Sequence, residues 1–357
     1  MDVIDRDLKN IISELSKDEL NRFKNKNIFI SGTNGFLGNW FLAFFNYINK
    51  NVYTTHDRCT VIHGDTKTMD ITERGCLESI PRCHFYINGA GIASPKWYKK
   101  QPFKTLDVSY TGTVNVFNKA LLDEAESVMS FSSSEVYGDP PAEYIPTPET
   151  YTGQIPTMSS RSCYDVGKLV IETLSDIFYN EYKLPVKVIR PFNLYGPYMR
   201  LDDGRMMANL CKSIAENDIM SVYGDGTQTR TYCYVADAIL LMIKALLSDK
   251  NGEVFNVGSE DIEMSAYDVC KTTYEILNGD IDNLRIIEHP SFYPKDEPTR
   301  RKPDISKIVS AFGNKPATTF DQGIKKTYEY VLTTYTQNEY NLYYGGTVFP
   351  DKRKENR

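Results

Sequence analysis

A short apolar run followed by three evenly spaced glycines constrains the fold of this chain more than any other feature. Residues 27–31 predict a buried strand, and the apolar stretch 40–48 predicts a helix. Between them Gly32, Gly35 and Gly38 form a G-x-x-G-x-x-G turn. A glycine pattern of this kind indicates a dinucleotide-binding turn only when it follows a strand and precedes a helix, as it does here.

Each glycine of this turn has a separate physical task. The first permits the tight turn, the second lets the backbone approach a pyrophosphate, and the third lets the helix pack closely on the strand. Helix amides then face the phosphates. We therefore expect a dinucleotide site made of Gly32, Asn34, Gly35, Phe36, Leu37 and Gly38. A glycine-rich turn without a cofactor is the alternative interpretation.

The remaining chain alternates strand and helix patterns over its first half. Further strands are predicted at residues 51–55, 60–63, 84–88, 128–132 and 186–190, with helical segments at 112–126 and 164–182. This alternation predicts an α/β fold, a Rossmann-type doubly wound parallel sheet covered on both faces. From about residue 191, prolines and glycines mark loops.

The pattern divides the chain into four expected parts. Residues 1–26 carry apolar positions at helical spacing and a capping box from Ser16 to Glu19, which predicts a helical extension. A dinucleotide-binding domain is expected over 27–190. A smaller α/β substrate-binding lobe is expected over 191–335, with segments that cross back, and a tail over 336–357.

A second group of candidate functional residues lies about 130 positions after the glycine turn. Tyr164 and Lys168 have i, i+4 spacing, so one helix turn puts phenol and ammonium on one face. An ammonium lowers the pKa of a neighbouring phenol from about 10. Such a phenolate can take a proton from a hydroxyl while a nicotinamide takes the hydride. Y-x-x-x-K also occurs by chance on exposed helices.

Composition narrows the class of protein. A formal net charge of −6 over 357 residues gives no global reason to expect nucleic acid as a partner. We find no apolar run of bilayer length and no cleavable leader, so we expect no membrane partner and a cytoplasmic location. Seven cysteines without a C-x-x-C pair suit a reducing compartment, and four scattered histidines give no metal spacing.

Taken together, these motifs resemble the extended short-chain dehydrogenase/reductase family, the NAD-dependent epimerases and dehydratases that act on nucleotide sugars. The resemblance spans residues 27–332 and is strongest to the UDP-glucuronate decarboxylase branch. The segments that carry it are 133–140 (SSEVYGDP), 161–168 (RSCYDVGK), 190–197 (RPFNLYGP), 202–205 (DDGR), 223–230 (YGDGTQTR) and 301–305 (RKPDI). The family pattern has a glutamate where this chain has Val166.

The resemblance implies a role for each matching residue. Tyr164 is the base, Lys168 holds the nicotinamide ribose, and Ser133 bonds the reacting hydroxyl. Glu135 relays a proton through water, and Arg301 lies near the substrate carboxylate. The implied substrate-binding residues are Ser134, Glu135, Arg161, Asn193, Arg205, Asn209, Tyr223, Arg230 and Arg301.

Some of these residues also fit simpler interpretations. Arg230 alone suits a surface salt bridge, although a guanidinium matches phosphate oxygens. Arg205 can anchor a loop, and Arg301 can pair with Asp296 or Glu297 in its own loop.

The resemblance also bears on the reaction. Dehydratases of the family usually carry an aspartate that protonates the departing hydroxyl, and Ser134 stands there in this chain. A serine is a poor general acid near neutral pH. Simple 4-epimerases commonly lack the glutamate that Glu135 provides. The expectation is therefore decarboxylation of a nucleotide glucuronate after C4 oxidation. An epimerase, a 4,6-dehydratase and a noncatalytic cofactor sensor remain alternatives.

The resemblance implies NAD as cofactor and a homodimer formed through helices near 112–126 and 164–180. An acidic residue should bind the adenosine ribose about twenty positions after the glycines. Asp57 is the nearest candidate, and Arg58 beside it would instead suit the extra phosphate of NADP. The other residues expected around the cofactor are Asp70, Ile71, Ala90, Gly91 and Ala93.

Overall fold

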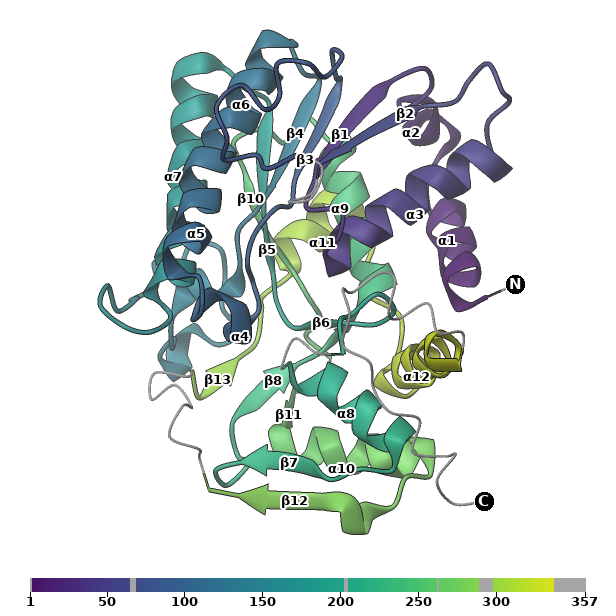
Figure 1. The fold of residues 1–357 in the computed structure, drawn as a ribbon, viewed down its shortest axis with the longest axis vertical. Helices are drawn as coiled ribbons and strands as arrows, with labels where there is room; N and C mark the ends of the chain where they lie inside the picture. The colour runs from purple at the N-terminus through teal and green to yellow at the C-terminus, as the bar shows by residue number, and fades with distance from the viewer. Residues whose placement is uncertain (1, 65–68, 202–204, 262, 289–297, 337–357) are drawn as a thin grey trace.

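A six-stranded parallel sheet forms the centre of the upper lobe in Figure 1. The computed structural model describes residues 2–64, 69–201, 205–261, 263–288 and 298–336. The strand order is β10-β5-β4-β3-β1-β2. The strands are β1 (Asn27–Ser31), β2 (Thr60–Gly64), β3 (Phe85–Asn88), β4 (Ser127–Phe131), β5 (Val186–Pro191) and β10 (Val254–Val257). The predicted parallel α/β fold is confirmed.

Helices cover both faces of this sheet because alternate strand residues point to opposite sides. Ile28 and Ile30 of β1 join the core on one face, and Phe29 joins the core on the other. The first face is covered by α3 (Phe36–Asn51), α9 (Val235–Leu247) and α11 (Ser306–Phe312). The second is covered by the π-helix η1 (Val108–Gly112), α6 (Thr113–Leu122) and α7 (Ser162–Tyr182). Shorter helices on this lobe are α4 (Pro95–Tyr98), α5 (Pro102–Asp107), η2 (Ser134–Tyr137) and η3 (Ala142–Tyr144).

The amino-terminal residues pack onto the first face of the sheet. Helix α1 (Val3–Ser13) contacts α9 and α3, and α2 (Lys17–Asn21) follows it. Ser16 accepts a hydrogen bond from the Glu19 amide at 3.1 Å, and Glu19 accepts one from the Ser16 amide at 2.7 Å. The expected capping box is therefore present.

The strand predicted at residues 51–55 is wrong. Helix α3 continues to Asn51, and Tyr53, which follows the helix, is buried in the core. The strand that pairs with β1 at this edge of the sheet is β2, whose Thr60 lies in register with Asn27. Residues 52–55 lie in the turns between α3 and β2, so β-branched and aromatic residues there did not indicate a strand.

The lower lobe of Figure 1 consists of small sheets and helices from the second half of the chain. One sheet has the order β11-β8-β13, and another pairs β12 with β7. Its elements are α8 (Met206–Glu216), β7 (Met220–Tyr223), β8 (Thr229–Thr231), β11 (Glu263–Ser265), α10 (Ala266–Leu277), η4 (Ile281–Asn283), β12 (Leu284–Ile287), β13 (Arg300–Arg301) and α12 (Phe320–Thr336). The pair β6 (Leu194–Tyr195) and β9 (Cys233–Tyr234) lies between the lobes. Strand β10 and helices α9 and α11 come from beyond residue 190 and lie on the upper sheet.

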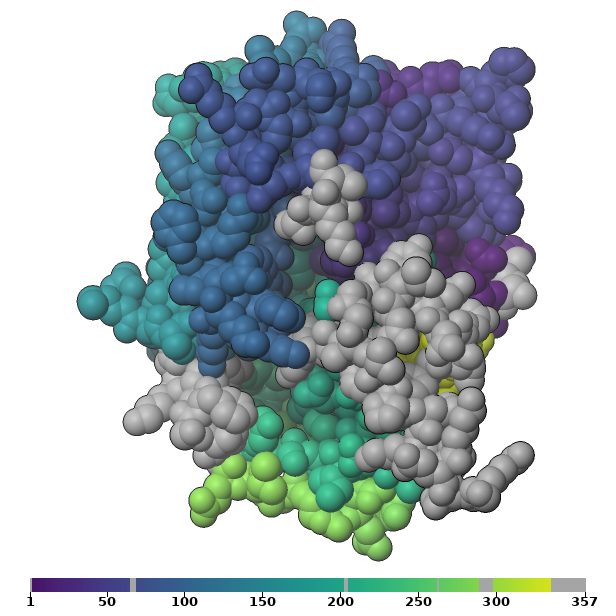
Figure 2. All heavy atoms as spheres, in the orientation of Figure 1, coloured from purple at the N-terminus to yellow at the C-terminus, as the bar shows by residue number. Residues whose placement is uncertain are grey.

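The two lobes face each other across the carboxyl ends of the parallel strands. Figure 2 shows a hollow between the blue atoms of the upper lobe and the green atoms of the lower lobe. Ligands of open α/β sheets bind at this end of the strands. None of the helices in the described part of the chain combines the length and hydropathy that crossing a bilayer requires. The same residues contain no cluster of three or more metal-binding side chains.

Candidate active site

The glycine turn after β1 is built as its sequence predicts. Gly32 has a φ of +78°, which favours glycine, and a Cβ there would lie 2.7 Å from the Gly89 carbonyl oxygen. A Cβ at Gly38 would lie 2.2 Å from the Gly32 carbonyl oxygen, so helix α3 packs against the turn at a distance that only glycine allows. Asn34 and Gly35 are exposed at the tip of the turn. The cradle therefore fits a dinucleotide diphosphate.

The helix that follows the turn supplies the amides for such a group. Gly35 precedes the first turn of α3, which begins at Phe36 and Leu37, and no described side chain caps it. Amides of a first helical turn have no partner within the helix and carry the positive end of its dipole. This end of α3 can therefore bind a phosphate.

The loop after β3 contacts both the glycine turn and helix α7, which carries Tyr164 and Lys168. The hydroxyl of Ser31 accepts hydrogen bonds from the Gly89 and Ala90 amides, both at 3.1 Å. A Cβ at Gly91 would lie 3.5 Å from the Lys168 Nζ atom. Lys168 and the glycine turn thus meet at the carboxyl end of the sheet. Ala93 is an exposed residue of the same loop.

Lys168 is buried under this loop and has a fixed position. Its ammonium donates to the Phe131 carbonyl oxygen at 2.8 Å and lies 5.6 Å from the centre of the Tyr164 ring. Burial lowers the pKa of Lys168 to about 8, and the charge of Glu172 acts in the opposite direction. Glu172 in turn binds Arg190 through two hydrogen bonds of 2.7 and 2.6 Å.

Tyr164 lies on the same helix and shares a hydrogen bond with Ser133. Its ring stacks on that of Tyr98, with centroids 5.5 Å apart and planes 16° from parallel. Burial raises the pKa of Tyr164 to about 12, while the Ser133 hydrogen bond and the charge of Arg205 act to lower it. The expected lowering of this pKa by Lys168 is therefore not found here. Burial is the largest influence on this pKa.

Glu135 lies between two guanidinium groups beside Ser133. Arg301 donates to its carboxylate twice, at 2.6 and 2.8 Å, and Arg161 donates to one of the same oxygens. Burial acts to raise the pKa of Glu135, but the charges of Arg301 and Arg161 outweigh it and hold that pKa below its ordinary value. The side chains of both arginines are less than a tenth exposed. Glu135 is therefore an anion at neutral pH.

Arg301 reaches this position from the lower lobe. It lies on β13, paired in register with Arg230 of β8, and it is 166 positions from Glu135 in sequence. Its expected alternative partners, Asp296 and Glu297, lie outside the described residues. Its Nε atom is buried without a hydrogen-bond partner among the described residues. A buried N–H group of this kind can donate a hydrogen bond to an oxygen atom of a ligand.

Asp165 is a site residue that the sequence interpretation missed. Its Oδ2 atom lies 3.5 Å from the Nε atom of Arg161, whose Nη2 atom binds Glu135. Burial and the negative charge of Glu135 raise the pKa of Asp165 to about 7. The only sequence signal was its place beside Tyr164, because its environment comes from residues far along the chain.

The other expected substrate residues lie around the boundary between the lobes. Arg230 is buried and donates to the Pro298 carbonyl oxygen at 2.7 Å, and Asn193 donates to the Thr231 carbonyl oxygen at 3.2 Å. Arg205 caps α8 and lies 5.9 Å from the ring of Phe36. Ser134 is buried, whereas Asn209 of α8 and Tyr223 of β7 are half-buried. The neighbouring positions 202–204 lie outside the described residues.

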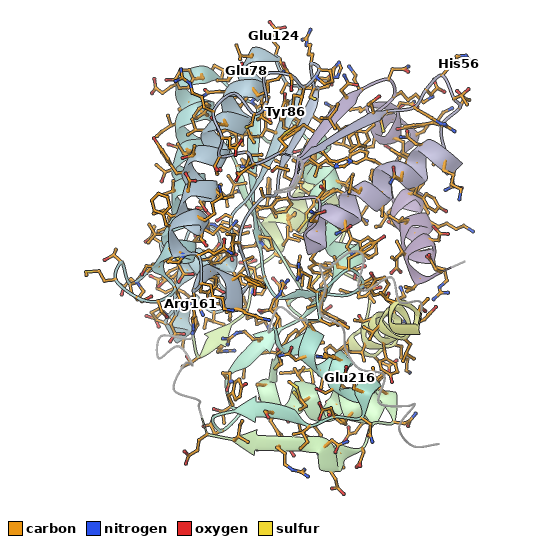
Figure 3. All side chains as sticks on the ribbon, viewed as in Figure 1. His56, Glu78, Tyr86, Glu124, Arg161 and Glu216 are labelled. Carbon is orange, nitrogen blue, oxygen red and sulfur yellow. The ribbon has the colours of Figure 1, made fainter. Side chains whose placement is uncertain are left out.

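The structure places Asp57 away from the expected adenosine end of the cofactor site. Asp57 precedes β2, at the amino end of the sheet, where it pairs with Lys24 at 3.3 Å. In Figure 3 its neighbour His56 lies at the far end of the lobe from Arg161. Asp57 therefore does not lie beside the glycine turn. The reason is that β2 begins after Asp57, at Thr60, so Asp57 lies before the strand and not at its carboxyl end.

Asp70 and Ile71 lie beyond the carboxyl end of β2. Asp70 accepts a hydrogen bond from Lys104 at 2.6 Å, and Ile71 packs against Gly112, where an added Cβ would lie 2.7 Å from its Cδ1 atom. These two residues stay compatible with an adenine-side role. The residue that directly follows β2 in sequence is Asp65, which lies outside the described residues.

Sequence comparison assigns the family. The model of the NAD dependent epimerase/dehydratase family matches residues 28–258. The protein named UDP-glucuronic acid decarboxylase 5 of Arabidopsis thaliana is 32% identical over 317 residues, covering 84% of this chain and 87% of that protein. UDP-glucuronic acid decarboxylase 1 of Xenopus tropicalis is 34% identical over 243 residues, covering 68% of this chain and 55% of that protein.

Solved structures agree on the fold. A UDP-glucose 4-epimerase of Thermotoga maritima, solved with UDP-glucose, has a TM-score of 0.74 at 22% identity and covers 87% of this chain and 99% of its own. A dTDP-glucose 4,6-dehydratase of Streptomyces venezuelae, solved with NAD, has a TM-score of 0.73 at 19% identity and covers 88% of this chain and 98% of its own. This chain therefore belongs to the NAD-dependent epimerase/dehydratase family of enzymes.

Proposed function

We propose that the chain is an NAD-dependent decarboxylase that converts a nucleoside-diphosphate-glucuronate to the corresponding pentose. The observation that carries this proposal is the convergence of Arg301 and Arg161 on Glu135, next to Ser133 and Tyr164. Guanidinium groups bind carboxylates with matched geometry. A substrate carboxylate at C6 would find two buried cations beside the group that oxidises C4. The names of the curated relatives point the same way.

Each residue has a defined task in this reaction. Bound NAD would supply the hydride acceptor for oxidation at C4 and the hydride donor for the final reduction. Tyr164 acts in its ionised form, which burial disfavours and which the Ser133 hydrogen bond and the charge of Arg205 favour. In that form its Oη atom receives the proton of the C4 hydroxyl, and Ser133 holds that hydroxyl by a hydrogen bond. Lys168 is fixed by the Phe131 carbonyl oxygen, so its ammonium can contact a ribose.

The oxidised sugar is a β-keto acid, which loses carbon dioxide without a metal. The C5–C6 bond breaks, its electron pair stays on the sugar as an enolate, and a solvent proton then adds at C5. Glu135 is held as an anion, so it orders a water molecule as an acceptor rather than acting as a general acid. Ser134 cannot protonate a leaving hydroxyl, which disfavours water elimination.

The remaining site residues extend the proposal along the substrate. Arg230 and Asn193 are proposed to bind the diphosphate, and Arg205 the sugar or diphosphate at the entrance. Asn209 and Tyr223 are proposed to contact the nucleoside from the lower lobe. The cofactor is proposed to lie along the glycine turn, with Asp70, Ile71, Ala90, Gly91 and Ala93 around its adenosine and ribose.

We also propose that two copies of this chain associate. Exposed apolar residues gather on α5, η1 and α7, which pack side by side: Phe103, Leu106, Tyr110, Leu169 and Ile177. Clustered exposed apolar side chains mark protein interfaces. Light scattering should give twice the chain mass, and Leu169→Glu with Ile177→Glu should give the single mass. All seven cysteines are free thiols, which supports a reducing, cytoplasmic location.

The proposed reaction is tested by product analysis. Purified protein with NAD is incubated with UDP-glucuronate and, in parallel, with UDP-glucose and dTDP-glucose. Mass spectrometry should detect carbon dioxide and a nucleotide pentose from the first substrate only. A 4-epimer of UDP-glucose, or a 4-keto-6-deoxy sugar from dTDP-glucose, without any pentose would refute decarboxylation and assign the corresponding alternative.

A further inference from the structure

Asp165 is a buried carboxyl group to which the proposed mechanism gives no task. It follows Tyr164 on α7 and is 6% exposed. Its Oδ1 atom is buried and has no hydrogen-bond partner among the described residues. An unsatisfied buried acceptor destabilises the folded state, so its retention needs a reason.

The contact of Asp165 with Arg161 provides that reason. The Arg161 Nε atom lies 3.5 Å from Asp165 Oδ2, while its Nη2 atom donates to Glu135. One guanidinium is thus held between two carboxylates from different elements, α7 and η2. Since Arg161 precedes the first residue of α7, Asp165 one turn later fixes its side chain against Glu135.

The charges around Asp165 depend on whether it carries a proton. The groups facing it are Glu135 from η2, Arg161 and Tyr164 from the start of α7, Cys163 beside them, and Arg301 from β13. Arg161 and Arg301 contribute two positive charges and Glu135 one negative charge. The cluster therefore has a net charge of +1 when Asp165 is neutral and zero when it is ionised.

We infer that Asp165 is a positioning residue that holds Arg161 against Glu135 and, by gaining or losing its own proton, sets the charge that a carboxylate-bearing nucleotide sugar meets. This inference rests on the proposed function only for the identity of that sugar. A neutral Asp165 leaves the cluster cationic and favours a carboxylate ligand. An ionised Asp165 repels such a ligand.

The direction of the pH dependence follows. Burial and Glu135 raise the pKa of Asp165 to about 7, so the group loses its proton as pH rises through neutrality. Affinity for a nucleotide glucuronate should fall over the same range. An added charge within a buried site changes affinity by about tenfold. Affinity for the nucleotide glucose, whose sugar carries no carboxylate, should change much less.

The test is calorimetric binding of UDP-glucuronate and UDP-glucose to the protein loaded with NADH, which cannot accept a hydride and so prevents turnover, at about pH 6 and about pH 8. In the wild type, the ratio of the two affinities should fall by about tenfold between these values. In Asp165→Asn, which cannot ionise, the ratio should be the same at both. Asp176→Asn, an exposed aspartate on the same helix, should behave as the wild type.

The outcomes separate this inference from the proposed reaction. A ratio that is constant with pH in the wild type overturns the role of Asp165, and this measurement holds even where Asp165→Asn does not fold. An equal pH dependence in wild type and Asp165→Asn also overturns it, even if pentose forms. A pH-dependent ratio that Asp165→Asn abolishes supports it, even if no carbon dioxide is released and the reaction proposal fails.

Discussion

Two neighbouring arginines of β13 offer a test of how burial sets the strength of an ion pair. Arg301 binds Glu135 through contacts of 2.6 and 2.8 Å, and Arg300 binds Glu263 through contacts of 2.5 and 2.8 Å. The pair geometries match, but the Arg301 side chain is 5% exposed and that of Arg300 is 43% exposed. Substituting each glutamate by glutamine keeps the shape and removes the charge.

The expected magnitudes differ for a physical reason. Glu135→Gln leaves Arg301 and Arg161 buried without their shared anion, and breaking a buried pair in this way costs about 3–5 kcal/mol. Glu263→Gln leaves Arg300 free to turn into water, which costs about 1 kcal/mol or less. Removing the Glu135 charge also lowers the pKa of Asp165, so Asp165 ionises more readily in this variant and offsets part of the loss by balancing Arg161.

The measurement is urea unfolding of wild type and both variants at about pH 6, where Asp165 of the wild type is protonated. The midpoint should fall much further for Glu135→Gln than for Glu263→Gln, with unchanged slopes of the unfolding curves. Equal midpoints for the two variants would refute the reasoning, because burial would then have no influence on the pair.

Three further outcomes follow from the site. Tyr164→Phe should keep NAD binding, because its ring still stacks on Tyr98, and should lower turnover by about a hundred- to ten-thousandfold; near-normal turnover rules out the base assignment. Gly38→Ala should lower the free energy of unfolding by roughly 1–3 kcal/mol and weaken NAD binding in a titration, because its Cβ would meet the Gly32 carbonyl oxygen; unaltered binding would show that the turn can shift. Asp165 keeps its proton up to about pH 7 in the folded state but releases it near pH 4 when unfolded, so its contribution to stability falls as pH rises across this window, by up to about 4 kcal/mol. Asp165→Asn should remove this slope from the unfolding free energy measured against pH; an unaltered slope contradicts the raised pKa.

Sequence patterns predicted the elements whose geometry is local. The G-x-x-G-x-x-G turn depends on the backbone freedom of Gly32 and on close packing at Gly38, both set within a few residues. The i, i+4 spacing places Tyr164 and Lys168 on one face of α7 once that helix forms. The parallel sheet followed from the alternation of strands and helices.

The sequence predictions were wrong for residues whose surroundings are formed by segments distant in sequence. Asp57 has the right residue type and nearly the right spacing, but α3 runs to Asn51 and the chain turns before β2, which leaves Asp57 at the opposite end of the sheet. The pKa of Tyr164 was expected to be low from its lysine neighbour. It is raised because packing removes the phenol from water, a term that no local spacing reveals.

The sequence by itself determined the glycine cradle, the Tyr-Lys helix and the class of sheet, because backbone sterics and helical periodicity act over a few residues. Only the tertiary structure brought Arg301 across 166 positions onto Glu135. It alone also enclosed Asp165 so that its pKa rises to about 7. Charge interactions and desolvation depend on distance in space and on access to water. Both are set only by the folded arrangement of the two lobes around the site.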